Sequence, residues 1–433
     1  MITRLIDRLD LSTCNFLAVK TIREALDAAG FNELKTGENW KPKPGGKYYT
    51  IKNSSAIFAF IPGTKSMAES GCRIIASHSD SPCFKIKPNA EIRGEGGCVS
   101  LNVEKYGGGI LYTWFDRPLS ISGRVFTDSG DPLHPEEHLV DLERPVATIP
   151  HLAIHFNRAV NEGNPLSVQK DMKPVIGIVG DKEWEESKRH GGLVKMMVAD
   201  KLGIAPEKIL EYELCLYPCE KGTLTGINSD YFQSGRIDDL SMAFASLEAF
   251  AEESGHETEF TRILAIFDNE ETGSGTKQGA HSPVLKSIIE RLCIGLGGKG
   301  EDYHRAISRS FMISADNAHG WHPNYNEKYD PTNHPVLGGG PVIKINANCK
   351  YMTDADGAAV FRLLCAKAGV PCQYFVNHSD VAGGSTLGNI LTSQMDIRGV
   401  DMGNAVWAMH SAIETASVAD HEMTVRVFRT FYK

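Results

Sequence analysis

The sequence predicts an α/β fold with a β-rich domain inserted into it. Apolar strand-like runs alternate with helical patterns in residues 1–83 and again in residues 229–433, as in parallel sheets covered by helices on both faces. Between them, residues 84–228 carry short strand-like runs among many glycines and prolines, which is typical of a separate β-rich unit. We therefore expect the first and last segments to build one domain that the middle segment interrupts.

The first segment starts with a helix and continues with strands. Apolar residues between Phe16 and Leu26 recur at helical spacing, and Gly30 stands where helices commonly end. Polar turn residues and apolar runs then predict strands at 48–51, 56–61 and 73–77.

The other two segments differ in the elements that they predict. The inserted segment has strand-like runs at 85–88, 110–114 and 119–126, and one clear helix at 192–201. In the last segment we expect helices at 240–254 and 358–368, strands at 263–267, 311–315 and 373–377, and further helical segments at the end.

Composition and charge exclude several classes of protein. With 42% hydrophobic and 23% charged residues, the chain has the composition of an ordinary globular protein. The net charge of -9 and the absence of a clustered basic patch argue against nucleic-acid binding. Residues 1–11 lack the apolar core of a secretory signal, and no stretch is long enough to span a bilayer, so we expect a cytoplasmic protein without a membrane partner. The ten scattered cysteines are expected to be reduced, mostly buried thiols.

The first motif with chemical potential is His78-Ser79-Asp80, directly after the apolar run at 73–77. A histidine two residues before an aspartate allows the imidazole to face a metal while the carboxylate fixes its orientation. A histidine in a loop is more often only solvated, so this motif indicates a metal site only together with the motifs described next.

Paired carboxylates form the next two motifs. Asp238 and Asp239 lead into a predicted helix; an aspartate at a helix start is usually a cap, which is the default for Asp239, and Asp238 is the better ligand candidate. Glu270 and Glu271 follow the apolar strand at 263–267, where adjacent carboxylates repel each other unless cations or protons compensate.

Asp316, after the strand at 311–315, and His410 complete the set. A lone histidine beside Met409 is more often packed in a core than a ligand. As a set, however, two histidines and several carboxylates supply what a pair of neighbouring zinc ions requires, with one carboxylate shared and one left as a base. Open α/β sheets place their ligand sites at strand ends, where most of these residues are expected.

These motifs resemble those of the M18 (aspartyl aminopeptidase-like) metallo-aminopeptidases, in the same order along the whole chain. The matching segments are His78–Pro82, Ser234–Asp239, Asp268–Ser274, Ser314–His319, Val342–Asn346 and Ala408–Ser411. The resemblance implies a zinc-peptidase α/β/α sandwich in which residues 84–228 form an inserted dimerisation domain. It also implies a homo-oligomer, a dodecamer built from dimers.

The resemblance assigns roles to the candidate metal ligands. His78 and Asp316 would bind one zinc ion, Glu271 and His410 the other, and Asp238 would bridge them, with cobalt or manganese as alternatives for one ion. The catalytic pair would be Glu270, as general base, and Asp80, as the partner that orients His78. The peptide bond between Asp238 and Asp239 is expected to be cis.

Substrate contacts are also implied by the resemblance. They would come from Lys344, His319, His322, Tyr351 and Gly384, and from His155 of a neighbouring subunit. From the residues alone, Lys344 in an apolar strand either points to solvent or pairs with a structural carboxylate. The resemblance instead has it face the first side chain of the substrate.

The sequence thus predicts an aminopeptidase that hydrolyses N-terminal residues from peptides, with acidic Asp or Glu preferred. The loop 377–386 departs from the family pattern, which makes neutral residues such as Leu the alternative. A related two-zinc deacylase or carboxypeptidase is a further alternative, and a metal-free scaffold ranks lowest because every ligand and the base are present.

Overall fold

The computed structural model describes residues 1–433, which form two compact units. The first unit comprises residues 1–80, 222–409 and 414–433, and the second comprises residues 81–221 with 410–413. The inserted segment expected from the sequence, residues 84–228, has limits close to those of residues 81–221.

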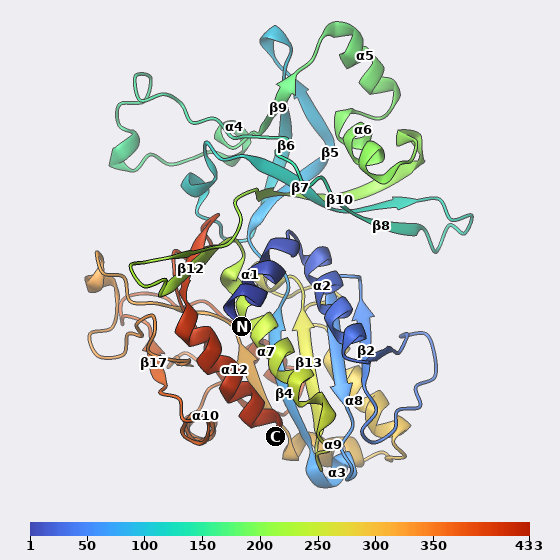
Figure 1. The fold of residues 1–433 in the computed structure, drawn as a ribbon, viewed down its shortest axis with the longest axis vertical. Helices are drawn as coiled ribbons and strands as arrows, with labels where there is room; N and C mark the ends of the chain where they lie inside the picture. Colours follow the sequence, from blue (N-terminus) through green and yellow to red (C-terminus); the bar gives the residue numbers. More distant parts are fainter. The chain divides into compact units, whose positions relative to one another are not determined.

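A nine-stranded mixed sheet is the centre of the first unit (Figure 1). Its order is β1 (Asn32–Glu33), β2 (Tyr48–Lys52), β3 (Ala56–Ile61), β13 (Thr261–Phe267), β4 (Cys72–His78), β14 (Phe311–Ala315), β18 (Arg398–Gly403), β16 (Val342–Ile345) and β17 (Gln373–Val376). The four central strands β13, β4, β14 and β18 are parallel, whereas β3 and β16 run antiparallel to their inner neighbours. The outer pairs β1–β2 and β16–β17 are also parallel, so the expected mostly parallel sheet is confirmed.

Helices cover both faces of this sheet. Because successive residues of each central strand point to opposite sides, each strand contributes side chains to a core on either face. Ile75 of β4 packs in a core with the helices α1 (Ile2–Leu11), α2 (Asn15–Ala28), α7 (Ile237–Glu252), α10 (Ala355–Ala368) and α12 (Val418–Tyr432). Its neighbour Ile74 belongs to the opposite core, with α3 (Met67–Ser70), α8 (Val284–Gly295), α9 (Asp302–Arg309) and α11 (Leu387–Thr392).

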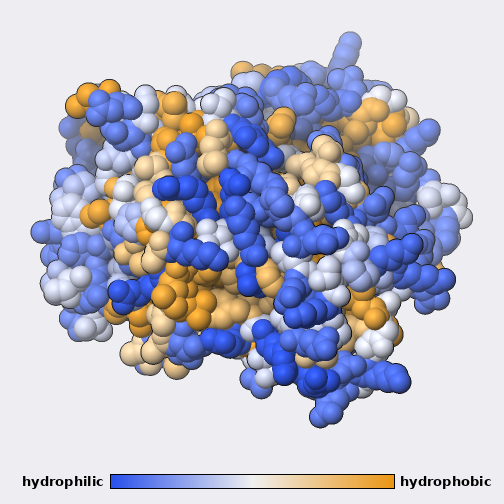
Figure 2. Space-filling model, turned by 60° about the horizontal axis from the view of Figure 1, so that its bottom comes forward, coloured by the Kyte–Doolittle hydropathy of each residue, from blue (hydrophilic) through white to orange (hydrophobic).

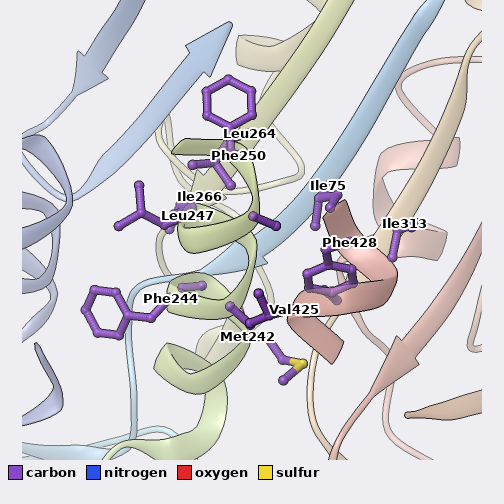
Figure 3. Close-up of a cluster of buried hydrophobic side chains, with 14 of the residues drawn as sticks. Ile75, Met242, Phe244, Leu247, Phe250, Leu264, Ile266, Ile313, Val425 and Phe428 are labelled. Atoms are coloured by element: carbon purple, nitrogen blue, oxygen red, sulfur yellow. The ribbon is translucent and has the colours of Figure 1, made fainter. Parts of the chain in front are cut away.

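Helix α7 is the most buried of these helices, with every residue from Ile237 to Phe250 inside the protein. It packs between the sheet and α12, which leaves little of its surface to water and explains its apolar composition on all sides. Figure 3 shows its side chains against residues of β4, β13, β14 and α12; those labelled are Met242, Phe244, Leu247, Phe250, Ile75, Leu264, Ile266, Ile313, Val425 and Phe428.

A second, five-stranded sheet in the first unit was not foreseen from the sequence. It consists of β11 (Thr223–Thr225), β12 (Tyr231–Ser234), β20 (Glu414–Ser417), β19 (Ala405–Trp407) and β15 (Ala318–His319). Its strands are too short for a clear alternation of polar and apolar residues. Strand β12 leads almost directly into α7 and so fixes where that helix begins.

The second unit is built on a six-stranded antiparallel sheet with its own core. The strand order is β8 (Glu136–Asp141), β7 (Leu119–Thr127), β10 (Ile209–Pro218), β5 (Cys83–Arg93), β6 (Cys98–Tyr106) and β9 (Val175–Ile178). Three helices accompany it: α4 (Val168–Asp171), α5 (Asp181–Arg189) and α6 (Leu193–Leu202).

Two expectations for the second unit were wrong. Residues 110–114 do not form a strand, because Leu111–Trp114 fold into a 3₁₀ turn that buries Trp114 edge-on against Phe84, with ring centroids 5.1 Å apart. Helix α5 was missed because its sequence is almost entirely charged or polar and shows no apolar stripe.

The surface and the cysteines concern both units. Figure 2 shows a face on which hydrophilic side chains predominate and hydrophobic ones form small, separate patches. No helix has both the length and the apolar character needed to cross a membrane. All ten cysteines are free thiols, as expected, but only half of them are buried, which is fewer than the sequence predicted.

Candidate active site and metal centre

The candidate residues of the first unit gather at the ends of three adjacent strands. His78 is the last residue of β4 and lies opposite Phe267, the last residue of β13. Glu270 begins a short 3₁₀ turn after β13, and Asp316 directly follows β14 on the other side of β4. Since these strands are parallel, their carboxyl ends lie at one edge of the sheet, as the sequence predicted.

A histidine and several carboxylates meet at this edge. Ligand atoms of His78, Asp238, Asp239 and Asp316 all lie within 4.8 Å of one another, and all four residues are buried. The Nε2 atom of His78 is 3.8 Å from Oδ1 of Asp316, 4.0 Å from Oδ1 of Asp238 and 4.0 Å from Oε2 of Glu270. One imidazole nitrogen thus faces three carboxylates.

Asp80 contacts the other ring nitrogen of His78, Nδ1. Nδ1 of His78 lies 3.0 Å from the backbone oxygen of Asp80 and 3.2 Å from its Oδ1, so it can donate its proton there and leave Nε2 as the free ligand atom. The Asp80 carboxylate also accepts hydrogen bonds from the backbone N–H groups of Glu270 and Glu271, at 3.1 and 3.2 Å. It therefore orients the imidazole and the acidic turn together.

Asp239 was expected to cap helix α7, and this expectation was wrong. Asp238 and Asp239 keep non-helical backbone angles at the start of α7, and the hydrogen bonds of the Asp239 side chain do not go to the backbone of this helix. Instead, the Asp239 carboxylate accepts hydrogen bonds from the backbone N–H of His78 at 3.2 Å and from Nδ2 of Asn317 at 3.4 Å. The peptide bond between Asp238 and Asp239 is cis, as the resemblance implied.

Electrostatics show how much negative charge is concentrated here. Burial, with the nearby charges of Asp316, Asp80 and Asp238, raises the pKa of Glu270 to about 8, against an opposing effect of His78. Burial also raises the pKa of Glu271 and that of Asp239 well above the usual range of carboxyl groups. Such a set of carboxyls favours protons or cations in its vicinity.

Asp316 is the exception because a buried cation accompanies it. Nζ of Lys344, in β16, lies 3.1 Å from Oδ2 of Asp316 and 3.2 Å from the backbone oxygen of Asn317. Burial alone would raise the pKa of Asp316, but Lys344 and His78 hold it below its usual range. The residues alone left two possibilities for Lys344, exposure to solvent or pairing with a carboxylate. Lys344 is buried and pairs with Asp316, so the second possibility is confirmed.

The other predicted substrate residues of the first unit lie on segments that follow the strands β14, β16 and β17. Tyr351 is buried, with its ring 5.3 Å from Nζ of Lys344. His319 is exposed on β15, with its ring centroid 5.6 Å from that of Phe375. His322 is half-buried and Gly384 exposed.

Two candidates belong to the second unit. His410 lies in the segment 410–413, where its backbone oxygen accepts a hydrogen bond from the N–H of Ile110 at 2.9 Å. His155 lies in an exposed loop between β8 and α4. Their roles as metal ligand and substrate contact remain predictions from the resemblance.

Comparison with known proteins identifies the family. A family model described as aminopeptidase I zinc metalloprotease (M18) matches residues 9–432. The chain belongs to the M18 aminopeptidase family. A relative in Clostridium novyi (strain NT), named Probable M18 family aminopeptidase 2, is 45% identical over 428 residues, which cover 99% of this chain and 97% of the relative. This M18 protein is accordingly a metallo-aminopeptidase, and thus a hydrolase.

Solved structures of M18 proteins share the fold. The protein described as the Ape4 and Nbr1 complex superposes with a TM-score of 0.95 at 34% identity, over 99% of this chain and 85% of that chain. The protein described as the S. cerevisiae mApe1 dodecamer superposes with a TM-score of 0.87 at 29% identity, over 99% of this chain and 95% of that chain. The expected M18 fold is therefore confirmed.

The donor set of this chain fits the zinc of its family. Zinc prefers imidazole and carboxylate ligands at open catalytic sites, and the cluster around His78 offers both in a buried position. The raised pKa values of Glu270 and Glu271 indicate negative charge that a bound cation would neutralise.

Proposed function

We propose that this M18 aminopeptidase holds two zinc ions and removes acidic residues from the N-termini of peptides in the cytoplasm. The observation that carries the proposal is the convergence of His78, Asp238 and Asp316 on one buried point, with Glu270 beside them. A carboxyl group without a coordination role, next to a cluster of ligands, is the arrangement that metal-assisted hydrolysis requires.

The proposed ligand sets follow the resemblance. His78 and Asp316 hold one ion, Glu271 and His410 hold the second, and Asp238 lies between the two. The hydrogen bonds of Asp80 support this assignment, because they leave Nε2 of His78 directed at the carboxylates and fix the backbone of Glu271. Zinc at such a site supplies Lewis acidity toward a carbonyl oxygen and lowers the pKa of water.

Glu270 is the group that moves protons in the proposed reaction. It takes a proton from the attacking water and delivers it to the leaving amine as the first peptide bond breaks. A carboxyl group that is not a metal ligand but lies beside the metal site is free to accept this proton and release it again. The backbone N–H of Glu270, bound to Asp80, keeps this side chain at the strand end.

The preference for acidic N-termini rests on Lys344. An ammonium group has three N–H donors, and Asp316 and the backbone oxygen of Asn317 accept from two of them. A carboxylate of the substrate would use the third. Because Lys344 is buried, water would screen the attraction between its ammonium group and a substrate carboxylate only weakly.

The chain is also proposed to work as a homo-oligomer, a dodecamer built from dimers of the second unit. The loop that carries His155 exposes three apolar side chains: Leu152 at 57%, Ile154 at 52% and Phe156 at 83%. Apolar residues gathered in one exposed loop are typical of an interaction site. The related mApe1 is described as a dodecamer, and His155 would contact the substrate of a neighbouring subunit.

Metal analysis combined with a substrate panel tests the proposal. We expect two zinc ions per chain and higher kcat/KM for Asp and Glu than for Leu or Lys aminoacyl substrates. Cleavage of N-acyl amino acids in place of aminoacyl substrates would favour a deacylase or carboxypeptidase. A metal-loaded protein that cleaves neither class would contradict the proposal and leave a scaffold role.

A further inference from the structure

A cavity of about 390 Å³ lies in the first unit. It opens between β2, the segment before β2 that carries Thr36 and Trp40, and the beginning of helix α8. Its volume falls in the range of about 300–1,000 Å³ that is common for small-molecule sites. None of its lining residues belongs to the proposed catalytic or metal-binding set.

The charged residues that line this cavity all have one sign. They are Lys52, Lys277 and Arg291, and no acidic side chain is among the lining residues. Helix α8 begins at the cavity, where Ser282, Pro283 and Val284 line it, so the positive end of a 12-residue helix adds to the same potential.

Arg291 is fixed in place by the wall of the cavity. Its guanidinium group stacks over the Trp40 ring, 3.9 Å from the centroid, and its Nη1 donates to the backbone oxygen of Thr36 at 2.8 Å. These contacts involve neutral partners and leave the positive charge of Arg291 uncompensated by a carboxylate. Nζ of Lys277 likewise has a neutral partner, Oδ1 of Asn53, at 2.8 Å.

The second observation is a buried hydroxyl without a partner. Thr50, on β2, lines the cavity and is 2% exposed, and its Oγ1 makes no hydrogen bond. A buried hydroxyl normally has a partner, and an unmade hydrogen bond costs about 1–3 kcal/mol. Beside it, Phe58 and Ile288 give the cavity an apolar floor.

We propose that this cavity binds a small organic anion, with its carboxylate or phosphate at the lysines and the α8 N-terminus and its apolar part on the floor. The hydroxyl of Thr50 would donate to a polar atom of the ligand. The proposal does not depend on the function of the active site. The ligand is defined by an anionic group on an apolar body. Two probes distinguish a carboxylate from a phosphate as its anionic group.

Calorimetric titration of the full-length protein tests this proposal with phenyl phosphate, benzoate and the neutral benzyl alcohol. We expect saturable binding of at least one of the two anions and none of benzyl alcohol; the tighter anion identifies the preferred head group. The double variant Lys52→Gln/Lys277→Gln should weaken the binding by about tenfold or more, since it removes two charges next to the ligand. Failure of both anions to bind at millimolar concentration would overturn the proposal.

A matched control separates a specific site from general surface charge. Lys286 lies on α8 but does not line the cavity, so Lys286→Gln removes one positive charge near the site and should leave the affinity unchanged. Thr50→Val should weaken binding without lowering the melting temperature, because the hydroxyl has no partner to lose. Equal weakening by Lys286→Gln and by the double variant, or full affinity in the double variant, would place the binding elsewhere.

Discussion

The Asp80 carboxylate binds the backbone of Glu270, with Oδ1 3.1 Å from the amide nitrogen, while the same residue contacts Nδ1 of His78. A side chain at the end of one strand therefore positions the acidic turn that follows the neighbouring strand. Asp80 therefore positions both the proposed base, Glu270, and the proposed metal ligand, His78.

Removal of this support should weaken metal binding. Asp80→Asn exchanges one carboxylate oxygen for an NH₂ group, which cannot accept from both backbone N–H groups of the acidic turn. We expect zinc affinity to fall about 10–100-fold, the range found for partners of ligating histidines. Competition with a chelator measures this loss, and Asp396→Asn on the surface is the control. Unchanged affinity would show that Asp80 does not orient the ligands.

Glu270→Gln should separate chemistry from metal binding. Glutamine keeps the shape of the side chain but cannot take a proton, so kcat should fall by about 10²–10⁴-fold while zinc content is retained. Steady-state kinetics and metal analysis on the same sample check both parts. The exposed Glu327→Gln is the matched control. Near-normal turnover would remove Glu270 from the role of base.

Lys344→Met tests specificity and the buried ion pair together. The variant leaves Asp316 buried without its cation, and loss of one partner of such a pair typically costs about 3–5 kcal/mol. We expect a lower melting temperature and a smaller ratio of kcat/KM for Asp substrates over Leu substrates. Lys344→Arg should retain part of this ratio because it keeps the charge. A ratio that survives in the methionine variant would mean that Lys344 serves Asp316 only.

His155 is predicted to act across subunits. His155→Ala should lower activity without changing the oligomer measured by light scattering, whereas the exposed His134→Ala should change neither. Mixed oligomers of His155→Ala and Glu270→Gln chains should regain activity, because some sites then combine an intact base with an intact neighbouring histidine. No recovery on mixing would confine His155 to its own subunit.

Acid stability should depend on His421, which is buried in α12 with no hydrogen-bond partner on either ring nitrogen. Burial, and the positive charges of the N-terminus, Arg8 and Arg4, lower its pKa from 6.5 to about 3. Between these pH values the unfolded chain binds a proton that the folded chain does not, so stability falls as the pH falls. At pH 5 the loss should reach about 2 kcal/mol.

Denaturant titrations at pH 7 and pH 5 measure this effect. His421→Leu should remove this part of the acid sensitivity and cost little at pH 7, since no hydrogen bond is lost. His304→Gln, at an exposed position, should keep the wild-type pH dependence. An identical loss of stability between the two pH values in His421→Leu and in the wild type would contradict the prediction.

The sequence predicted the strand ends better than it predicted the contacts between them. His78, Glu270 and Asp316 could be found because each follows an apolar run, and parallel strands bring such positions to one edge. The hydrogen bonds of Asp239 could not be found, because the default for an aspartate before a helix is local capping and its acceptor role depends on a distant strand. The partner of Lys344 was likewise open until β16 and β14 were placed in one sheet.

Elements with weak patterns account for most of the remaining differences. Helix α5 lacks an apolar stripe, and the strands β15, β19 and β20 are too short to show alternation. The run at 110–114 is apolar enough for a strand but folds as a turn around Trp114. In each case packing with distant residues decides the local structure.

The order of strands in the large sheet has a consequence for synthesis of the chain on the ribosome. Strand β4 lies between β13 and β14, which follow it only after residues 81–221 of the second unit have been made. Until Thr261–Phe267 emerges, β4 has neither neighbour, and Ile74 and Ile75 lack the partners that bury them on the two faces. Pairings this distant in sequence form slowly and expose apolar edges meanwhile. The nascent protein should therefore depend on chaperones longest in its first hundred residues, although these are translated first.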